Sequence, residues 1–322
     1  MRRPEALSPT ALDLYQSDIE KYVRKYICET RLPYEPQTEP QAIGSSFDAF
    51  VKNELLRTLY GEERVKKGEQ FNLETLFDSQ TKFFSDKTWA WENGMHVFNE
   101  YKASGAFDAL INDMKDTIPS FEQEVKAEVE MIDGTLVPLK GFPDCVFAHK
   151  NNRLVIVDWK CNNYCAKSKK SPHKYYINDR YNKGSSHKES TVENVDGLLI
   201  DTKNCFSKVN EKWATQICIY HWICGSPIGG EIIGQIEQLL GIPSTDSLKP
   251  KVRCVTYRNF ISKDFQIALS EKVSKIWKNV ESYNFFELNE EDTAKKINEL
   301  DCKNRFLAGD NPLLKILANR KK

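Results

Sequence analysis

Two aspartates and one lysine are spaced so that a simple β-hairpin would bring them together. Two apolar runs, at residues 141–148 and 154–160, flank a short polar turn, which is typical of two antiparallel strands. In such a hairpin Asp144 pairs directly with Asp158, with Cβ atoms roughly 5 Å apart on one face. Lys160, two residues after Asp158, points to the same face.

Adjacent carboxylates repel each other unless a cation lies between them, so the pair indicates a site for a hard metal ion with a lysine beside it. The alternative is an ordinary ion pair of Asp158 with Lys160 at a strand end. The metal site is favoured because Gly-Phe-Pro precedes Asp144, and a Val-Ile-Val run typical of a buried central strand precedes Asp158. Mg²⁺ or Mn²⁺ suits these oxygen ligands, and the site offers no His and Cys set for zinc.

The composition predicts a soluble, globular protein. The 322 residues suffice for one large domain or two small ones, and 40% are hydrophobic and 29% charged. Neither a transmembrane run nor a signal peptide is visible, so we expect no membrane partner. The nine cysteines include no C-x-x-C pair, so we expect reduced thiols and a cytoplasmic location. The formal net charge is zero, so attraction to phosphate must come from a local patch.

The hydrophobic periodicity predicts one α/β domain spanning residues 1–322, with a small central mixed β-sheet flanked by helices and helical N- and C-terminal additions. Residues 1–120 form its helical N-terminal part, 121–258 its core and 259–322 its helical C-terminal part. Residues 30–42, with three prolines, are expected to be a loop, and 162–210 an irregular insertion. Helices are predicted at 8–26, 45–60, 72–116, 212–224, 264–286 and 290–302, and strands at 121–131, in the hairpin and at 251–257.

Two predicted helices carry further candidate site residues. Asp48 follows the apolar spacing of the helix at 45–60, so it lies near the buried side and needs a partner. The alternative is that Asp48 lies in the first turn and interacts only with the helix dipole, and Glu54 is a second candidate. Gln216 and Tyr220 share a helix face, where they could contact a nucleotide or phosphate, although Tyr220 could simply belong to the core.

The segment 166–188 is strongly basic, with seven cations against one acid, Asp179, and three interleaved tyrosines. Cations for phosphates and flat rings for bases are typical of a nucleic-acid contact. The alternative is a solvated loop. The candidate DNA-binding cations are Lys167, Lys169, Lys170, Lys174 and Arg180.

These motifs together resemble the PD-(D/E)xK nuclease superfamily, in the RecB-type branch that includes phage exonucleases. The resemblance covers about residues 8–60 and 121–225, in family order. The matching segments are Ser8-Pro-Thr-Ala-Leu12, Gly44-Ser-Ser-Phe-Asp48, Gly141-Phe-Pro-Asp144, Asp158-Trp-Lys160 and Gln216-x-x-x-Tyr220.

The resemblance implies a restriction-endonuclease-like core in which Asp144, Asp158 and the Trp159 carbonyl bind Mg²⁺ or Mn²⁺, with Asp48 a further ligand. Lys160 would position or help deprotonate the attacking water, and Gln216 and Tyr220 would contact DNA near the scissile phosphate. Many members have His at the position of Asp48, where a carboxylate can also bind a metal ion. Some relatives hold a four-cysteine iron–sulfur cluster, but no cysteine trio clusters near the C-terminus, so none is predicted.

The sequence therefore predicts a metal-dependent DNA nuclease, in particular an exonuclease of recombination, repair or phage replication. A recombination or single-strand-binding protein is a candidate partner. Two alternatives stay open: a nuclease-like module that binds DNA or protein without cleavage, and a site-specific endonuclease.

Overall fold

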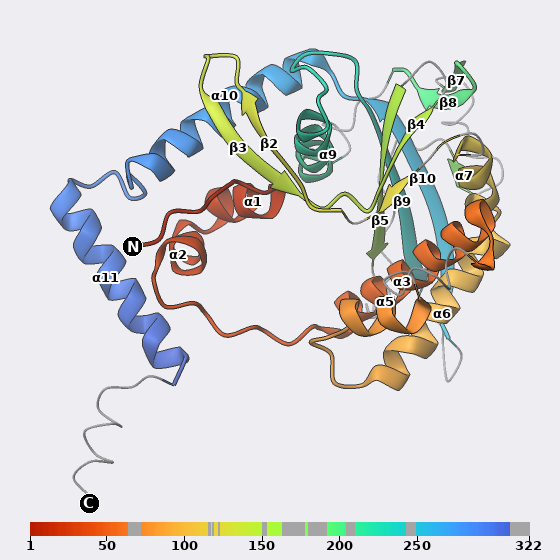
Figure 1. Ribbon diagram of the computed structural model, residues 1–322, viewed down its shortest axis with the longest axis horizontal. Helices are drawn as coiled ribbons and strands as arrows, with labels where there is room; N and C mark the ends of the chain where they lie inside the picture. Colours follow the sequence, from red (N-terminus) through yellow and green to blue (C-terminus); the bar gives the residue numbers. More distant parts are fainter. Residues whose placement is uncertain are drawn as a thin grey trace, which may run out of the picture.

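A mixed eight-stranded sheet forms the centre of the part of the chain that the computed structural model describes (Figure 1). That part comprises residues 1–63, 72–114, 117, 119–121, 123–149, 153–162, 178–179, 192–203, 210–242 and 249–309. Seven strands follow in the order β1-β4-β5-β9-β10-β8-β7, and β6 also pairs with β10. A separate two-stranded sheet joins β2 to β3.

The strands are β1 (Ser120–Phe121), β2 (Val125–Glu130), β3 (Leu136–Gly141), β4 (Cys145–His149), β5 (Arg153–Asn162), β6 (Asn178–Asp179), β7 (Val192–Val195), β8 (Leu198–Asp201), β9 (Ile233–Ile242) and β10 (Lys251–Phe260). The helices are α1 (Pro9–Ser17), α2 (Ile19–Tyr22), the π-helix η1 (Val23–Ile27), α3 (Glu39–Tyr60), α5 (Leu73–Gln80), α6 (Lys87–Ala103), α7 (Ala106–Met114), α9 (Glu211–Ile223), α10 (Lys263–Glu281) and α11 (Glu290–Leu307).

The central strand β5 separates two hydrophobic cores because its buried side chains alternate between the two faces of the sheet. Val157 and Trp159 pack with residues of α3, α6 and α7 on one face. Ile156 packs with residues of α9 and β9 on the other face. The sheet is therefore covered on both faces, with α9 on one and the α3–α6–α7 group on the other.

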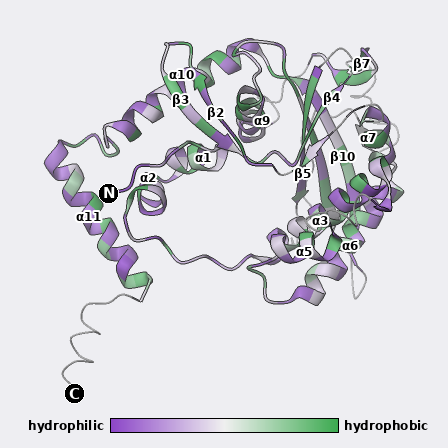
Figure 2. Ribbon diagram, in the orientation of Figure 1, coloured by the Kyte–Doolittle hydropathy of each residue, from purple (hydrophilic) through white to green (hydrophobic). Residues whose placement is uncertain are grey.

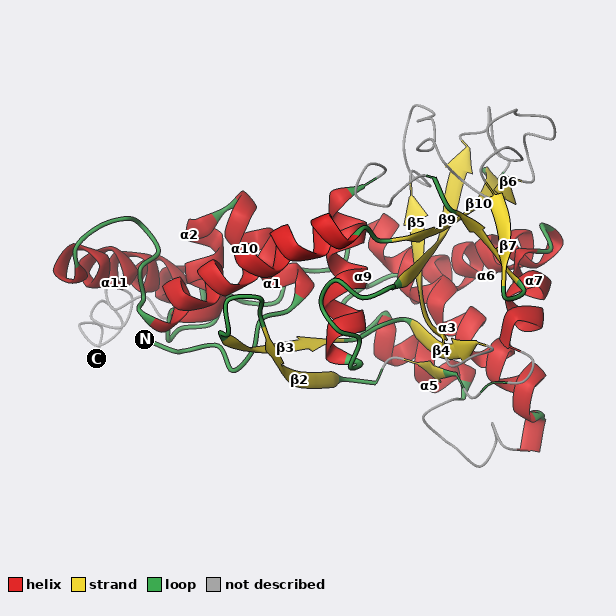
Figure 3. Ribbon diagram, turned by 90° about the horizontal axis from the view of Figure 1, so that it is seen from above, coloured by secondary structure: helices red, strands yellow, loops and turns green. Residues whose placement is uncertain are grey.

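Helices from both ends of the chain form a second part of the molecule, beside the β2–β3 sheet (Figures 1 and 3). The Ser8 side chain accepts a hydrogen bond from the Ala11 N–H and caps α1, as its sequence predicts. Hydrophobic and hydrophilic residues alternate along α10 (Figure 2), which buries Leu269, Val273 and Trp277 at helical spacing. No helix within the described ranges is long and apolar enough to cross a membrane.

Several predicted elements differ from the observed ones. The strand expected at 121–131 is two strands, β1 and β2, which belong to different sheets. The strand expected at 141–148 is likewise divided, because Gly141 ends β3 and β4 begins only at Cys145. The sheet is larger than predicted, since β9 was missed and the supposedly irregular insertion contains β6, β7 and β8.

The helix expected at 45–60 begins earlier, at Glu39, within the predicted proline-rich loop. Thr38 and Gln41 form a capping box, and Pro40 lies in the first turn, where it lacks only an N–H that the helix does not use. Asp48 consequently lies in the middle of α3.

Candidate active site

The predicted hairpin forms with the predicted register. Cys145 pairs with Val157 and Val146 with Ile156 in antiparallel β4 and β5, and Asp144 directly precedes β4. Continuing the register by one residue places Asp144 opposite Asp158. The Trp159 N–H donates a hydrogen bond to Asp144 Oδ2 at 2.9 Å, so this carboxylate is held against the end of β5.

Asp158 is the most buried acid of the site, with 1% of its side chain exposed. Lys160 Nζ lies 2.5 Å from Asp158 Oδ2, and Gln216 Nε2 donates to Asp158 Oδ1 at 2.9 Å. Burial raises the pKa of the Asp158 carboxyl above its usual value, Lys160 acts against this rise, and Asp144 adds to it. Burial also lowers the pKa of Lys160, but Asp158, Asp144 and Asp48 outweigh it and leave the pKa raised, so Lys160 stays cationic at neutral pH.

Gln216 and Tyr220 come from α9 on the same face of the sheet as Asp158. Asn210 caps α9 by accepting hydrogen bonds from two backbone N–H groups of its first turn. Gln216 Oε1 accepts from Lys160 Nζ at 3.1 Å, and its Nε2 also donates to the Tyr220 hydroxyl at 3.1 Å. The amide of Gln216 therefore bonds to both charged residues, and its bond to Tyr220 confirms that the two residues share a helix face.

Gly141 makes room for Tyr220. A Cβ at position 141 would lie 2.3 Å from Cε1 of the Tyr220 ring, closer than packed atoms can approach. The Tyr220 hydroxyl also lies within hydrogen-bonding reach of the Phe142 main chain. The segment that leads into Asp144 is thus packed against α9.

Asp48 lies on α3 and is 14% exposed at its side chain. It pairs with Lys52 one turn later, and Gln80 Nε2 of α5 donates to Asp48 Oδ2 at 2.7 Å. The alternative interpretation as a first-turn charge is wrong, because Asp48 is far from the N-terminus of α3. The negative charge of Asp48 also contributes, as the smallest of the causes, to the raised pKa of Lys160.

Glu54, the other candidate on α3, forms ion pairs with Lys102 at 2.5 Å and Arg57 at 3.6 Å. Within the described part of the chain, these ion pairs of Glu54 do not include the site residues.

Sequence reasoning missed Lys52 and Gln80. Lys52 is 1% exposed, and its charge acts on Asp158 as well as pairing with Asp48. Its position four residues after Asp48 was a usable signal. The sequence holds no such signal for Gln80, because Gln80 reaches Asp48 only when α5 folds against α3.

The oxygen atoms of Asp144, Asp158 and Asp48 are the donors that Mg²⁺ and Mn²⁺ prefer. Three carboxylates against two lysines, Lys52 and Lys160, leave carboxylates in excess, which favours a cation. Their oxygens contact lysine, amide and N–H groups. Within the described ranges, no group of three or more His, Cys, Asp and Glu side chains is arranged to hold a metal ion.

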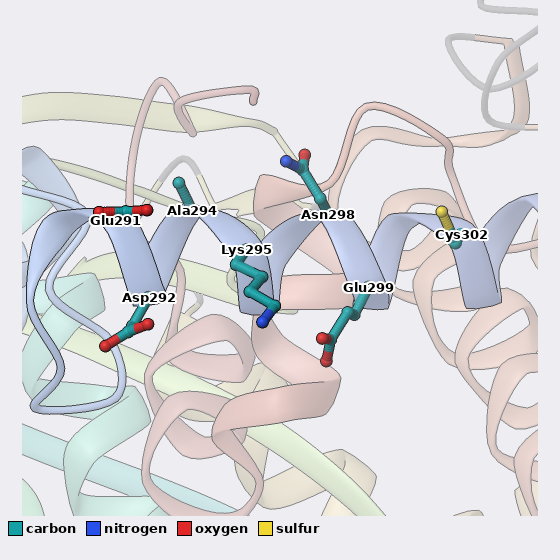
Figure 4. Close-up of a pocket in the computed structure, with 7 residues that line it drawn as sticks. All are labelled: Glu291, Asp292, Ala294, Lys295, Asn298, Glu299 and Cys302. Carbon is teal, nitrogen blue, oxygen red and sulfur yellow. The ribbon is translucent and has the colours of Figure 1, made fainter.

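The predicted DNA-contacting cations lie outside the residues that the structure describes: Lys167, Lys169, Lys170, Lys174 and Arg180. A depression of about 770 Å³ lies elsewhere, along α11, and its lining includes Glu291, Lys295, Glu299 and Cys302. These side chains project from one helix, and no element from the carboxylate site reaches them (Figure 4). We therefore locate the candidate site at the carboxylates.

No protein-family model and no curated protein matches the chain. One solved structure that it matches is the crystal structure of SSO0001, over 82% of this chain and 84% of that chain, at 10% sequence identity. The TM-score is 0.26, too low to indicate a shared fold or function.

Proposed function

We propose that the protein is a divalent-metal-dependent nuclease that hydrolyses phosphodiester bonds of DNA. The observation that carries this proposal is the geometry around Asp158. Asp144 continues the hairpin register opposite it, while Lys160 and Gln216 contact its two oxygens. A buried acid opposite a second acid, with a cationic side chain beside it, is an arrangement suited to charge stabilisation at a phosphate.

Phosphodiester hydrolysis requires neutralisation of phosphate charge and activation of water, which a bound divalent cation supplies. Asp144 and Asp158 would hold that cation, with Asp48 and the Trp159 carbonyl as further candidate ligands. Lys160 would orient the attacking water or offset developing negative charge. Gln216 keeps Lys160 and Asp158 in a fixed relation, which supports this division of roles.

The mixed sheet with its hairpin and α9 would correspond to a restriction-endonuclease-like core. Gln216 and Tyr220 would contact DNA beside the scissile phosphate, and the basic segment 166–188 would bind the backbone farther away. An exonuclease acting in the cytoplasm, in recombination, repair or phage replication, is the form that we propose. A recombination or single-strand-binding protein would be its partner.

The test is cleavage of end-labelled DNA, single- and double-stranded, linear and circular, with Mg²⁺, Mn²⁺ or EDTA. The wild type should cleave only with a divalent cation, and a requirement for ends would identify an exonuclease. Asp158→Ala and Lys160→Ala should each lower the rate by about 10³-fold or more, because several kcal/mol of transition-state stabilisation is lost.

Lys278→Ala is a matched control, since Lys278 also pairs with an aspartate, Asp133, but on an exposed surface. It should leave cleavage unchanged. Full activity of Asp158→Ala, or equal activity in EDTA, would refute the proposal. Tight DNA binding with no cleavage under any of these conditions would instead identify a binding module.

A further inference from the structure

Three of the four exposed aromatic side chains in the described part of the chain lie on segments attached to the candidate site. They are Tyr34, Phe83 and Phe142, with 79%, 40% and 52% exposure, and the fourth is Phe306 on α11. Single exposed hydrophobic residues are normal on protein surfaces. Their concentration on the segments beside the site carboxylates is what requires an explanation.

Phe142 lies two residues before Asp144, between β3 and β4. Its main chain is held in place, because Gly141 packs against the Tyr220 ring and the Tyr220 hydroxyl reaches the Phe142 backbone. Its ring belongs to neither hydrophobic core of the sheet. The Phe142 ring is therefore held by a fixed backbone and exposed to solvent two residues before Asp144.

Tyr34 and Phe83 form a second exposed aromatic surface. Their rings are stacked, with centroids 4.7 Å apart and planes 12° from parallel, and Lys82 Nζ lies 5.6 Å from the Phe83 centroid. Tyr34 remains largely exposed despite the stacking, so its ring is open to a further partner.

Gln37 attaches this stacked pair to the site. Its backbone N–H donates to the Phe83 carbonyl at 3.0 Å, and its side-chain Nε2 donates to the Gln80 carbonyl at 3.0 Å. The side chain of Gln80 in turn donates to Asp48 at 2.7 Å. One ring therefore lies two residues from Asp144, and the other ring surface is linked to Asp48 through Gln37 and Gln80.

We propose that Phe142 and the Tyr34–Phe83 pair are stacking platforms for unpaired bases, and hence that the ligand of this surface is single-stranded DNA. Rings offered edge-on or face-on to solvent bind every base through its π-face, whatever the sequence. Bases within a duplex are already stacked on their neighbours and cannot reach such rings. Lys82 supplies a positive charge beside the second platform. This inference rests on the proposed nuclease site for its location and names the substrate class.

The test is equilibrium binding of a fluorescent single-stranded oligodeoxynucleotide in EDTA, measured by anisotropy at several salt concentrations. A matched oligonucleotide with abasic positions keeps the phosphates and removes the bases. Phe142→Ala and Tyr34→Ala should each weaken binding of the intact strand by roughly five-fold to a hundred-fold. Binding of the abasic strand and the salt dependence should not change, because no phosphate contact is lost.

Phe306→Ala is the matched control, since α11 lies at the far end of the molecule from β5 (Figures 1 and 3), and it should bind like the wild type. Phe142→Tyr should retain affinity, because the ring is kept. Wild-type affinity in both alanine variants, or equal losses for intact and abasic strands, would overturn the inference. Because binding is measured without a divalent cation, a protein that binds through these rings but never cleaves would refute only the proposed hydrolysis.

Discussion

Replacing Gln216 tests whether one amide fixes the geometry of the proposed site. In the structure its Nε2 donates to Asp158 Oδ1 at 2.9 Å, and its Oε1 accepts from Lys160 at 3.1 Å. Gln216→Leu keeps a similar side-chain volume and removes these two bonds and the bond to the Tyr220 hydroxyl. A buried polar group that loses its partner costs about 1–3 kcal/mol, and more when it is charged. Because Asp158 is almost fully buried, we expect the free energy of unfolding to fall by about 3 kcal/mol.

Gln266→Leu provides the matched control. Gln266 is also buried, and it bonds to the main chain of Gly229, Gly230 and Ile261, away from the carboxylates. Urea unfolding should show comparable losses of stability for the two variants. Cleavage, measured where both are folded, should fall by about 10²-fold only in Gln216→Leu, because Lys160 and Asp158 lose their fixed relation. Equal activity of the two variants would refute a positioning role for Gln216.

Gln216→Glu tests the effect of a negative charge beside Asp158 while keeping nearly the same side-chain shape. It places a carboxylate oxygen where an N–H₂ group now contacts Asp158, so the two acids would share a proton and their folded-state pKa values would rise. The folded protein then keeps a proton that the unfolded chain has released. Stability is therefore present at low pH and lost as pH rises, and this variant should approach wild type near about pH 5 and weaken towards about pH 8. A penalty independent of pH would contradict this reasoning.

Asp48→Asn should weaken divalent-cation binding, measured by thermal shift with Mg²⁺, and should lower stability because the buried Lys52 loses its ion pair with Asp48. Unaltered cation binding would exclude Asp48 as a metal ligand. Burial raises the pKa of Glu237 to about 7 against hydrogen bonds from Thr256 and Gln235, so this residue alone should lower stability by about 3 kcal/mol as pH rises from about 4.5 to 7. Glu237→Gln should remove this part of the pH dependence and leave the part due to Asp158, and identical melting profiles of the two proteins would exclude the effect. Gly141→Ala should displace the Tyr220 ring and lower both stability and cleavage. In a chain that already carries Tyr220→Ala, Gly141→Ala should cause no further loss of stability. Losses of stability that add up in the double variant would argue against this clash.

The hairpin register was predictable because it depends on residues close in sequence. The turn and the alternation of β5 leave one pairing that buries the apolar side chains, and this pairing places Asp144 opposite Asp158. The face shared by Gln216 and Tyr220 was equally local, since it follows from helical spacing.

What the sequence did not predict depends on contacts between distant segments. The pairing of β5 with β9 is parallel and joins residues about 80 positions apart, so no local pattern specifies it. The three prolines of residues 30–42 predict a loop, but α3 begins at Glu39 because Pro40 suits a first helical turn. The contact of Gln80 with Asp48 likewise arises only when α5 folds against α3.

The contacts between the two ends of the chain have a consequence for synthesis on the ribosome. Arg24 Nε donates to Asn304 Oδ1 at 2.9 Å, and the Thr30 N–H donates to Asp301 Oδ1 at 2.8 Å, so η1 and the turn after it are completed by α11. Residues 24–30 are translated before α11 and must wait, without these partners, until residues 301–304 have been translated. Deleting α11 and deleting the first thirty residues would therefore abolish the same interface. A nascent chain that stalls before residue 301 exposes polar groups that are paired only once α11 has been translated.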